Sequence, residues 1–221
     1  MTKNASDLPP NPWNSRFDRT DYLFGTEPSA FVKANAHWLT SGLTSGLTSG
    51  LAPAREVFLP ADGEARNSTY LAGLGHKVTA SDYSTVALAK ARTLAASKGV
   101  SVDFRQVDLN GWAWPQSRFD AVIAVFIQFA DPSFRTEIFN GIKGAIRPGG
   151  LILLHGYTPK QLEYKTGGPS QVENLYTEAL LTSDFAGWQI HRLTSYEADL
   201  TEGAGHNGRS ALIDFIARKP D

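Results

Sequence analysis

The stretch LPADGEARN, residues 59–67, lies between an apolar run and a segment with the pattern of a helix. Val57, Phe58 and Leu59 lead into the turn, and STYLAGLG follows it. Where a strand turns into a helix, the first N–H groups of the helix have no partner within it, so they can contact a ligand. The turn holds one glycine, Gly63, which can let the backbone approach that ligand. The stretch therefore predicts a strand-loop-helix unit with a candidate nucleotide-binding loop.

Beyond this loop, short β-branched or aromatic runs alternate with longer amphipathic runs. Such alternation predicts a parallel sheet with helices on both faces, and right-handed crossovers make it doubly wound. We expect strands at residues 56–61, 77–82, 102–108, 120–126 and 150–157, and helices at 67–75, 84–99 and 133–150, the last ended by Pro-Gly-Gly. Two strand-like runs, 191–200 and 211–219, have no helix between them. The predicted fold is α/β, a single seven-stranded, mostly parallel Rossmann-like sheet with an antiparallel C-terminal edge hairpin.

The first 55 residues have a different pattern from the rest of the chain. Apolar residues recur at helical spacing from residue 28 to 39, which predicts a helix. The repeat LTSGLTSGLTSG follows at residues 39–50, and the glycine in each unit costs a helix about 1 kcal/mol relative to alanine. We therefore interpret the repeat as a flexible connector, and expect one structural domain over residues 56–221.

Composition excludes several classes of function. A formal net charge of −1 with 42% hydrophobic residues is typical of an ordinary globular protein, so no nucleic-acid partner is expected. The absence of cysteine excludes disulfides, thiolate zinc sites and a cysteine nucleophile, and no metal site is predicted. No run approaches the roughly 20 apolar residues that span a bilayer, and the N-terminus lacks an apolar signal core. We expect a cytoplasmic protein without a membrane partner.

Polar residues follow the first three predicted strands in order. Gly63 follows the first strand, Asp82 closes the second about 20 residues further on, and Asp108 closes the third. Ligands of such sheets bind at the carboxyl ends of the strands, so one adenosine could contact all three residues. Each residue also has a structural alternative. Asp82 could cap the next helix, and Gly63 and Asp108 could serve only their turns.

Several further stretches complete a known pattern. They are WNSRF at 13–17, YLFGTEPSAFV at 22–32, residues 63–84, FDAVIAV at 119–125, IRPGGLILLHGY at 146–157 and residues 202–220. On these stretches nearly the whole chain resembles class I S-adenosylmethionine-dependent methyltransferases, most of all the small tellurite-resistance and thiopurine-methyltransferase-like group. In that group the loop usually runs A-E-G-E-G-R-N. Here it runs ADGEARN, so Gly63 is kept and Ala65 stands where a glycine is usual.

The resemblance implies S-adenosyl-L-methionine as the cofactor and an N-terminal helical lid within residues 1–55. It also implies the residues that bind the cofactor. They are Trp13, Phe24, Ala61, Asp62, Gly63, Glu64, Arg66, Asn67, Asp82, Tyr83, Asp108, Leu109 and Val125. Trp13 and Phe24 would lie on the lid, although both could equally be core aromatics that anchor the segment.

Two residues depart from the pattern. Alanine at position 65 costs about 1 to 2 kcal/mol if the backbone there needs a positive φ, and nothing if it lies in the first helical turn. Leu59 stands where class I enzymes often carry an acid for the methionine amino group of the cofactor. Asp62 or Glu64 could replace that acid.

Candidate acceptor residues are His155 and Tyr157 at the end of one strand, and His206 and Arg209 in EGAGHNGRS. The glycines of that loop provide little packing, so His206 and Arg209 are interpreted as contacts to an acceptor, with His206 orienting or deprotonating it. Arg209 could instead pair with Glu197 or Asp199, and His155 could belong to the core edge. The resemblance implies a small-molecule acceptor with a soft nucleophile, a thiol or a chalcogen oxyanion, and a monomer or homodimer.

Other functions are less well supported by the sequence. It contains no P-loop, no G-x-S-x-G elbow and no H-E-x-x-H. Gly63 with Asp82 would also suit a nicotinamide-dependent oxidoreductase, but Tyr157 lacks a lysine four residues on, since Gln161 stands there. A non-catalytic adenosylmethionine-binding protein is the other alternative, suggested by Ala65 and Leu59.

Overall fold

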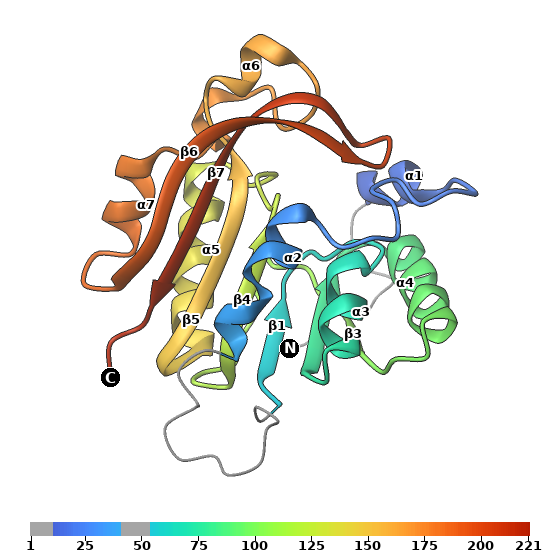
Figure 1. Cartoon of the computed structure of the whole chain (residues 1–221), viewed down its shortest axis with the longest axis horizontal. Helices are drawn as coiled ribbons and strands as arrows, with labels where there is room; N and C mark the ends of the chain where they lie inside the picture. Colours follow the sequence, from blue (N-terminus) through green and yellow to red (C-terminus); the bar gives the residue numbers. More distant parts are fainter. Residues whose placement is uncertain (1–10, 41–53) are drawn as a thin grey trace.

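The computed structural model describes residues 11–40 and 54–221. A seven-stranded sheet forms its centre, in the order β3-β2-β1-β4-β5-β7-β6 (Figure 1). The strands are β1 (Glu56–Leu59), β2 (Lys77–Asp82), β3 (Asp103–Gln106), β4 (Phe119–Val125), β5 (Ile146–Tyr157), β6 (Gln189–Glu202) and β7 (His206–Arg218). Strands β1 to β5 run parallel, and β7 pairs antiparallel with both β5 and β6. The predicted Rossmann-like sheet with an antiparallel edge hairpin is confirmed.

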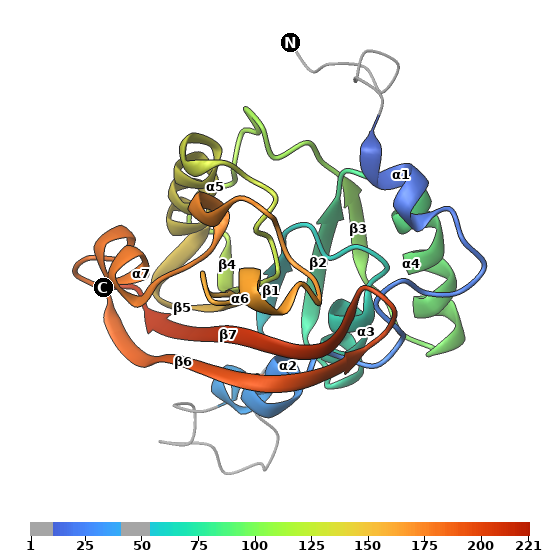
Figure 2. The ribbon, with the colours of Figure 1, turned by 90° about the horizontal axis from the view of Figure 1, so that it is seen from above.

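Helices cover both faces of this sheet. The longer ones are α3 (Arg66–Gly73), α4 (Thr85–Ser97) and α5 (Pro132–Ala145), at the three predicted places. Helix α5 lies on one face together with the short α7 (Glu178–Asp184), and α2 (Ala30–Asn35) and α3 lie on the other (Figure 2). Short helices and turns that were not predicted complete the chain, namely α1 (Pro12–Phe17), α6 (Gln161–Tyr164) and η3 (Val172–Asn174). None of the helices in the described ranges is long and apolar enough to cross a membrane.

The strands alternate their side chains between two cores. Val57 and Leu59 of β1 pack with Phe31 of α2 and Leu71 of α3, whereas Phe58 points to the other face and packs with Ile138 of α5. The same alternation continues in β4 and β5. Each fully buried side chain of this kind contributes about 1.5–3 kcal/mol, so a one-residue shift in register would expose both cores.

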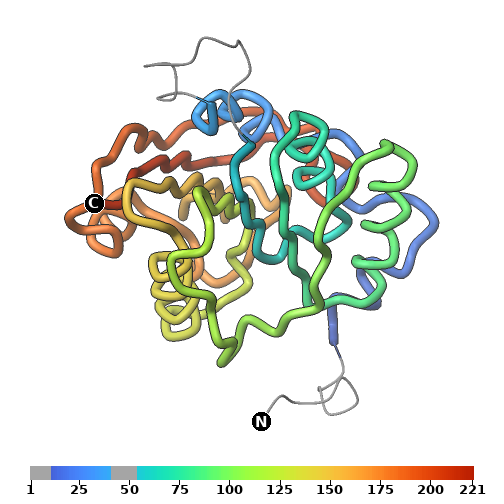
Figure 3. Tube along the Cα trace, turned by 90° about the horizontal axis from the view of Figure 1, so that it is seen from below, coloured from blue at the N-terminus to red at the C-terminus, as the bar shows by residue number. Residues whose placement is uncertain are grey.

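The predicted helix at residues 28–39 begins later and changes type. Ser29 caps α2, because its side chain accepts a hydrogen bond from the Val32 amide, and the chain continues as a tighter 3₁₀ turn, η2 (Ala36–Leu39). The LTSG repeat falls almost entirely on residues 41–53, outside the described residues. Figure 3 shows residues 11–28 beside α4, at the edge of the molecule where β3 lies.

The Pro-Gly-Gly stop was misplaced. Helix α5 ends at Ala145, and β5 already begins at Ile146 and runs through Pro148, Gly149 and Gly150. A proline disfavours the helical conformation in the residue before it, here Arg147, so the chain is extended before the proline is reached. Pro148, Gly149 and Gly150 therefore belong to β5, although the sequence predicted them as the end of the helix at residues 133–150.

The loop after β1 has left-handed backbone at three positions. Gly63 has a φ of 61°, which glycine adopts freely, but Ala61 has a φ of 50° and Ala65 a φ of 72°. Ala65 is the N-cap residue of α3 and does not lie in the first helical turn. Of the two alternatives for this position, the strained one with a positive φ is therefore correct. The side chain of Ala65 is buried, and its left-handed conformation costs about 1 to 2 kcal/mol relative to glycine.

We predict that Ala65→Gly stabilises the fold. The gain from relieved strain, about 1 to 2 kcal/mol, exceeds the cost of a more flexible unfolded chain, about 0.4–1 kcal/mol. Ala89→Gly on the exposed side of α4 is the matched control, since the same change in a helix costs about 1 kcal/mol. Urea unfolding should show the two midpoints moving in opposite directions. A urea midpoint lower than that of the parent for Ala65→Gly would contradict the proposed backbone strain at Ala65.

Candidate functional site

A cavity of about 490 Å³ opens at the carboxyl ends of the parallel strands. Its volume is within the usual range for sites that bind cofactors and small molecules. Of the predicted site residues, those that line it are Trp13, Phe24, Ala61, Asp62, Gly63, Arg66, Asn67, Asp82, Tyr83, Asp108, Leu109, Val125, Tyr157 and His206. The structure thus brings together residues from the N-terminal segment, the ends of the five strands β1 to β5 and the last hairpin.

The loop between β1 and α3 is fixed by hydrogen bonds to β2. The Gly63 amide donates to Oδ2 of Asp82 over 2.9 Å, and the Asp62 amide donates to the Ser81 carbonyl over 2.9 Å. The Ser68 amide of α3 in turn donates to Oδ2 of Asp62. These bonds join the ends of two neighbouring strands, so the loop keeps its shape although it contains one glycine.

Asp82 is not the cap of the helix that follows it. The N-cap of α4 is Ser84, whose hydroxyl accepts from the Ala87 amide, whereas Asp82 accepts from the Ser84 amide through Oδ1. Two backbone N–H groups therefore contact a carboxylate that has about four lone-pair positions. The remaining positions are available to hydroxyl groups in the cavity that Asp82 lines.

Two carboxyl groups in the cavity wall lack a cationic partner. Burial raises the pKa of Asp62 to about 7 and that of Asp82 to about 6. Both carboxylates accept hydrogen bonds from backbone amides, which lower the pKa, but the effect of burial is larger. Within the described ranges, neither carboxylate forms an ion pair. A cation in the cavity would therefore be attracted by two desolvated acids.

Asp108 both closes a turn and faces the cavity, the two roles that its sequence position allowed. Its Oδ1 accepts from the Asn110 amide over 3.0 Å, which closes a turn, and its side chain also lines the cavity. Apolar groups from neighbouring strand ends, Val107, Leu109 and Val125, lie in the same wall. This part of the site can hold a flat ring and present an acceptor at its edge.

The opposite end of the cavity is aromatic. The His206 ring lies 4.1 Å from that of Phe126 and 4.5 Å from that of Phe24, measured between centroids, and Tyr157 closes the group at 5.9 Å. Nδ1 of His206 and the Tyr157 hydroxyl are buried and have no hydrogen-bond partner in the described part of the chain. Burial lowers the pKa of His206 to about 3, so this imidazole is neutral at physiological pH.

Three predicted residues do not line the cavity. Glu64 is directed to the N-terminal segment, where it pairs with Lys90 and accepts from the Leu23 amide. His155 is buried behind Phe126 and contacts Asp214, with Nδ1 2.8 Å from the carboxylate. Arg209 is 49% exposed and pairs with Glu197 and Asp199. It therefore forms the surface ion pairs that were the alternative to a contact with the acceptor.

Sequence reasoning did not identify several residues that line the cavity. Arg16 stacks on Trp13, with its guanidinium carbon 4.7 Å from the ring centroid, and has no carboxylate partner among the described residues. Its place in WNSRF, between the tryptophan and the phenylalanine of that stretch, was the available signal. The other missed residues with long or aromatic side chains are Phe17, Phe126, Gln128, Phe129 and Phe134.

The donors and acceptors of this cavity fit S-adenosylmethionine. Asp82 can accept from ribose hydroxyls, Asp108 can accept from an amino group on a ring, and Asp62 can attract a cation. Arg16 supplies a positive group for a carboxylate. Of the two acids that could replace the one missing at Leu59, Asp62 lines the cavity, whereas Glu64 is already paired with Lys90.

Comparisons with known proteins agree with this geometry. Residues 61–150 match the family model described as "Methyltransferase domain". TehB from Haemophilus influenzae is similar, with a TM-score of 0.64 and 18% identity, over 84% of this chain and 60% of that one. A SAM-dependent methyltransferase from Methanosarcina mazei gives a TM-score of 0.62 and 19% identity, over 76% and 93% of the two chains.

A third similar structure is the magnesium protoporphyrin IX methyltransferase ChlM from Synechocystis PCC 6803 with bound SAH. Its TM-score is 0.62 at 17% identity, over 85% of this chain and 81% of that one. At such identities the likeness shows the fold alone. A search of the curated proteins gave no match.

The matched domain includes the loop after β1, Asp82 and Asp108, so the family match and the cavity concern the same residues. The sheet order and the antiparallel hairpin agree with the fold of the similar structures. Residues 61–150 therefore form a methyltransferase domain, and the described chain has the fold of the similar S-adenosylmethionine-dependent methyltransferases.

Proposed function

We propose that this methyltransferase acts on a small molecule with a soft nucleophile, a thiol or a chalcogen oxyanion, held at the aromatic end of the cavity. The observation that carries this proposal is the pair of unpartnered buried groups there, Nδ1 of His206 and the hydroxyl of Tyr157. A buried polar group without a partner costs about 1–3 kcal/mol, and an acceptor that bonds to both would remove that cost.

The walls of this end suit sulfur or a heavier chalcogen. Phe24, Phe126 and Tyr157 provide ring edges and faces around His206, and sulfur makes favourable contacts with aromatic rings. A histidine with a lowered pKa is a weak base, so His206 would orient the acceptor and not remove a strongly held proton. Soft nucleophiles need little help from a base.

The cofactor supplies an activated methyl group, and the residues of the chain align the acceptor and exclude water. Residues 11–27, here termed the lid, contribute Trp13, Phe17 and Phe24 to the cavity wall. A lid over the methyl group would keep water from the reaction. We assign the cytoplasm as the location, and a monomer or homodimer as the state.

Asp82→Ala should weaken the binding of S-adenosylmethionine by about 2 kcal/mol or more, roughly thirtyfold, because charged hydrogen bonds to two ribose hydroxyls are lost. Calorimetric titration measures the change. Asp103→Ala on the neighbouring β3 removes an exposed carboxylate and is the matched control. Equal affinity of the parent and Asp82→Ala would leave Asp82 with a role in the loop only.

Binding of the cofactor should strengthen as pH rises from 5.5 to 7.5 and should release protons. Asp62 and Asp82 have raised pKa values of about 7 and 6, so folding keeps them protonated at a pH where the unfolded chain has lost the protons. Their contribution to stability is present below about pH 4 and is lost as pH rises through 6 to 7. A cationic cofactor favours the ionised forms of both acids, so its affinity rises over the same pH range in which their contribution to stability is lost.

Titrations in buffers of different ionisation enthalpy measure the protons released. Asp62→Asn should reduce both the release and the pH dependence. An affinity that falls as pH rises over this range would contradict the role of the two acids.

His206→Ala should lower turnover at least tenfold, about 1.4 kcal/mol in activation free energy, with little change in cofactor affinity. Arg209→Ala is the control from the same hairpin, since its ion pairs lie outside the cavity and are worth at most about 1 kcal/mol. A methyl-transfer assay with a panel of thiols and selenium or tellurium oxyanions identifies the acceptor first. Full activity of His206→Ala would move the acceptor role to Tyr157.

A further inference from the structure

Glu64 lies in the cofactor loop, but its side chain is directed away from the cavity. It stands between Gly63 and Ala65, both with left-handed backbone, and its carboxylate is 97% buried against the lid. Burying a carboxylate costs a great deal of free energy unless it is paired with a cation and accepts hydrogen bonds. Lys90 of α4 provides the cation, and the Leu23 amide of the lid donates to Oε2 over 2.8 Å.

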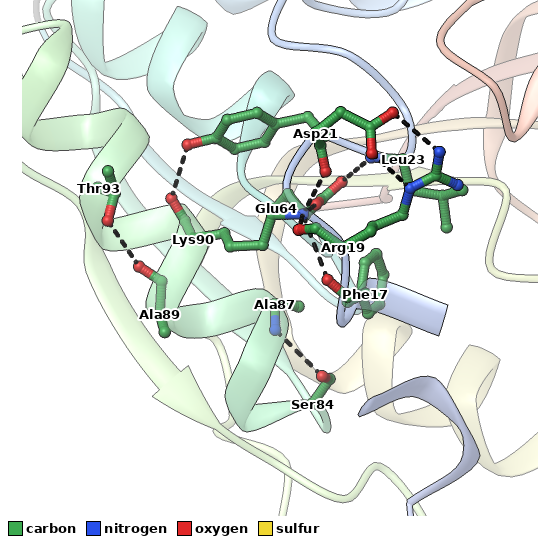
Figure 4. Close-up of polar contacts among 11 residues, drawn as sticks. Phe17, Arg19, Asp21, Leu23, Glu64, Ser84, Ala87, Ala89, Lys90 and Thr93 are labelled. Carbon is green, nitrogen blue, oxygen red and sulfur yellow. Dashed lines mark hydrogen bonds and ion pairs between the residues drawn. The ribbon is translucent and has the colours of Figure 1, made fainter. Parts of the chain in front are cut away.

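The ammonium group of Lys90 also holds the lid directly. It donates to the carbonyls of Phe17, Arg19 and Asp21, over 3.3, 3.2 and 2.6 Å (Figure 4). The Tyr22 hydroxyl donates back to the Lys90 carbonyl, and the ammonium lies 5.1 Å from the centroid of the Tyr22 ring. One ion pair between the loop and α4 therefore fixes the lid from residue 17 to residue 23.

The part of the lid that is held in this way carries side chains of the cavity. Phe17 lies against Gly63, where an added Cβ would be 3.4 Å from the Phe17 ring. The Phe17 ring stacks on that of Trp13 at 6.0 Å and contacts that of Phe24 at 6.2 Å, and all three rings line the cavity. A change at the ion pair can therefore reach the cofactor site through Phe17.

We propose that Lys90 and Glu64 are positioning residues, a clasp that holds the lid closed over the cofactor loop and thereby slows the release of the cofactor. The proposal rests on the proposed function in one respect, namely that residues 11–27 cover the cofactor. Neither side chain of the clasp lines the cavity, so their effect on the cofactor is indirect.

Other contacts keep the lid attached without the clasp. The Ser84 hydroxyl donates to Asn14, the Gly205 amide of the β6–β7 hairpin donates to the Leu23 carbonyl, and Arg66 donates to the Phe24 carbonyl. Loss of Lys90 should therefore loosen residues 17–23 without unfolding the sheet.

The test compares Lys90→Met, Glu64→Gln and the double variant with the parent. Lys90→Met leaves a buried carboxylate unpaired, whereas the double variant removes both charges, which keeps the test valid if the single variant is unstable. Arg92→Met is the control, because Arg92 is an exposed cation on the same helix and forms no ion pair with the described residues of the lid.

Hydrogen exchange of the protein without cofactor is the first measurement. We expect the amides of residues 17–23 to exchange at least tenfold faster in Lys90→Met and in the double variant, and unchanged in Arg92→Met. Stopped-flow release of S-adenosylmethionine is the second, with a dissociation rate at least tenfold higher in the same variants. The double variant should be no worse than the more affected single variant, since both changes break one ion pair.

Unchanged protection of these amides would overturn the clasp. Faster exchange with an unchanged dissociation rate would overturn its effect on the cofactor. Failure of the parent protein to bind S-adenosylmethionine would instead contradict the cofactor site itself, and the exchange measurement would still test whether Lys90 holds residues 17–23.

Discussion

The hydrogen bond from the Gly63 amide to the Asp82 carboxylate is the constraint on which the site depends. It joins the loop after β1 to the end of β2, and with the bond from Asp62 to the Ser81 carbonyl it fixes a turn that contains two left-handed alanines. The usual way to make such a turn is with glycine, because glycine has no Cβ to strain. Here the bonds across the strand ends supply the energy that holds Ala61 and Ala65 in that conformation, so a glycine-poor loop can keep its shape.

The same constraint determines the electrostatics of the cavity. Because Asp82 is drawn under the loop, it is desolvated, and its pKa rises although two amides donate to it. Asp62 is desolvated by the same turn. An empty site of this kind is slightly destabilised at neutral pH, and a cationic ligand reverses the effect. The two acids of the loop would therefore favour a positively charged ligand in the cavity.

Sequence patterns predicted the parts of the fold that repeat, and the strand ends that follow from them. Alternation along β1, β4 and β5 was sufficient because both faces of a parallel sheet are buried, and Asp82 and Asp108 followed from their positions at strand ends. Side-chain direction in the loop did not follow. Glu64 is adjacent to Gly63 in sequence, yet a left-handed residue on either side turns its carboxylate towards Lys90, which is 26 positions away. Arg16, Phe126 and the short α7 were missed because they depend on contacts between distant segments.

Methyl transfer places two opposing requirements on the N-terminal segment that covers the cavity. Water must be excluded during methyl transfer, but the cofactor must be exchanged in every cycle, so the cover needs to be firm and reversible. A lid packed only by apolar side chains would release slowly and without a defined hinge. In this chain residues 17–21 of the lid are held through their backbone carbonyls by one ammonium group, whose partner carboxylate belongs to the loop that would contact the cofactor. Any shift of that loop when the cofactor leaves would move Glu64, weaken its hold on Lys90 and free several lid contacts together.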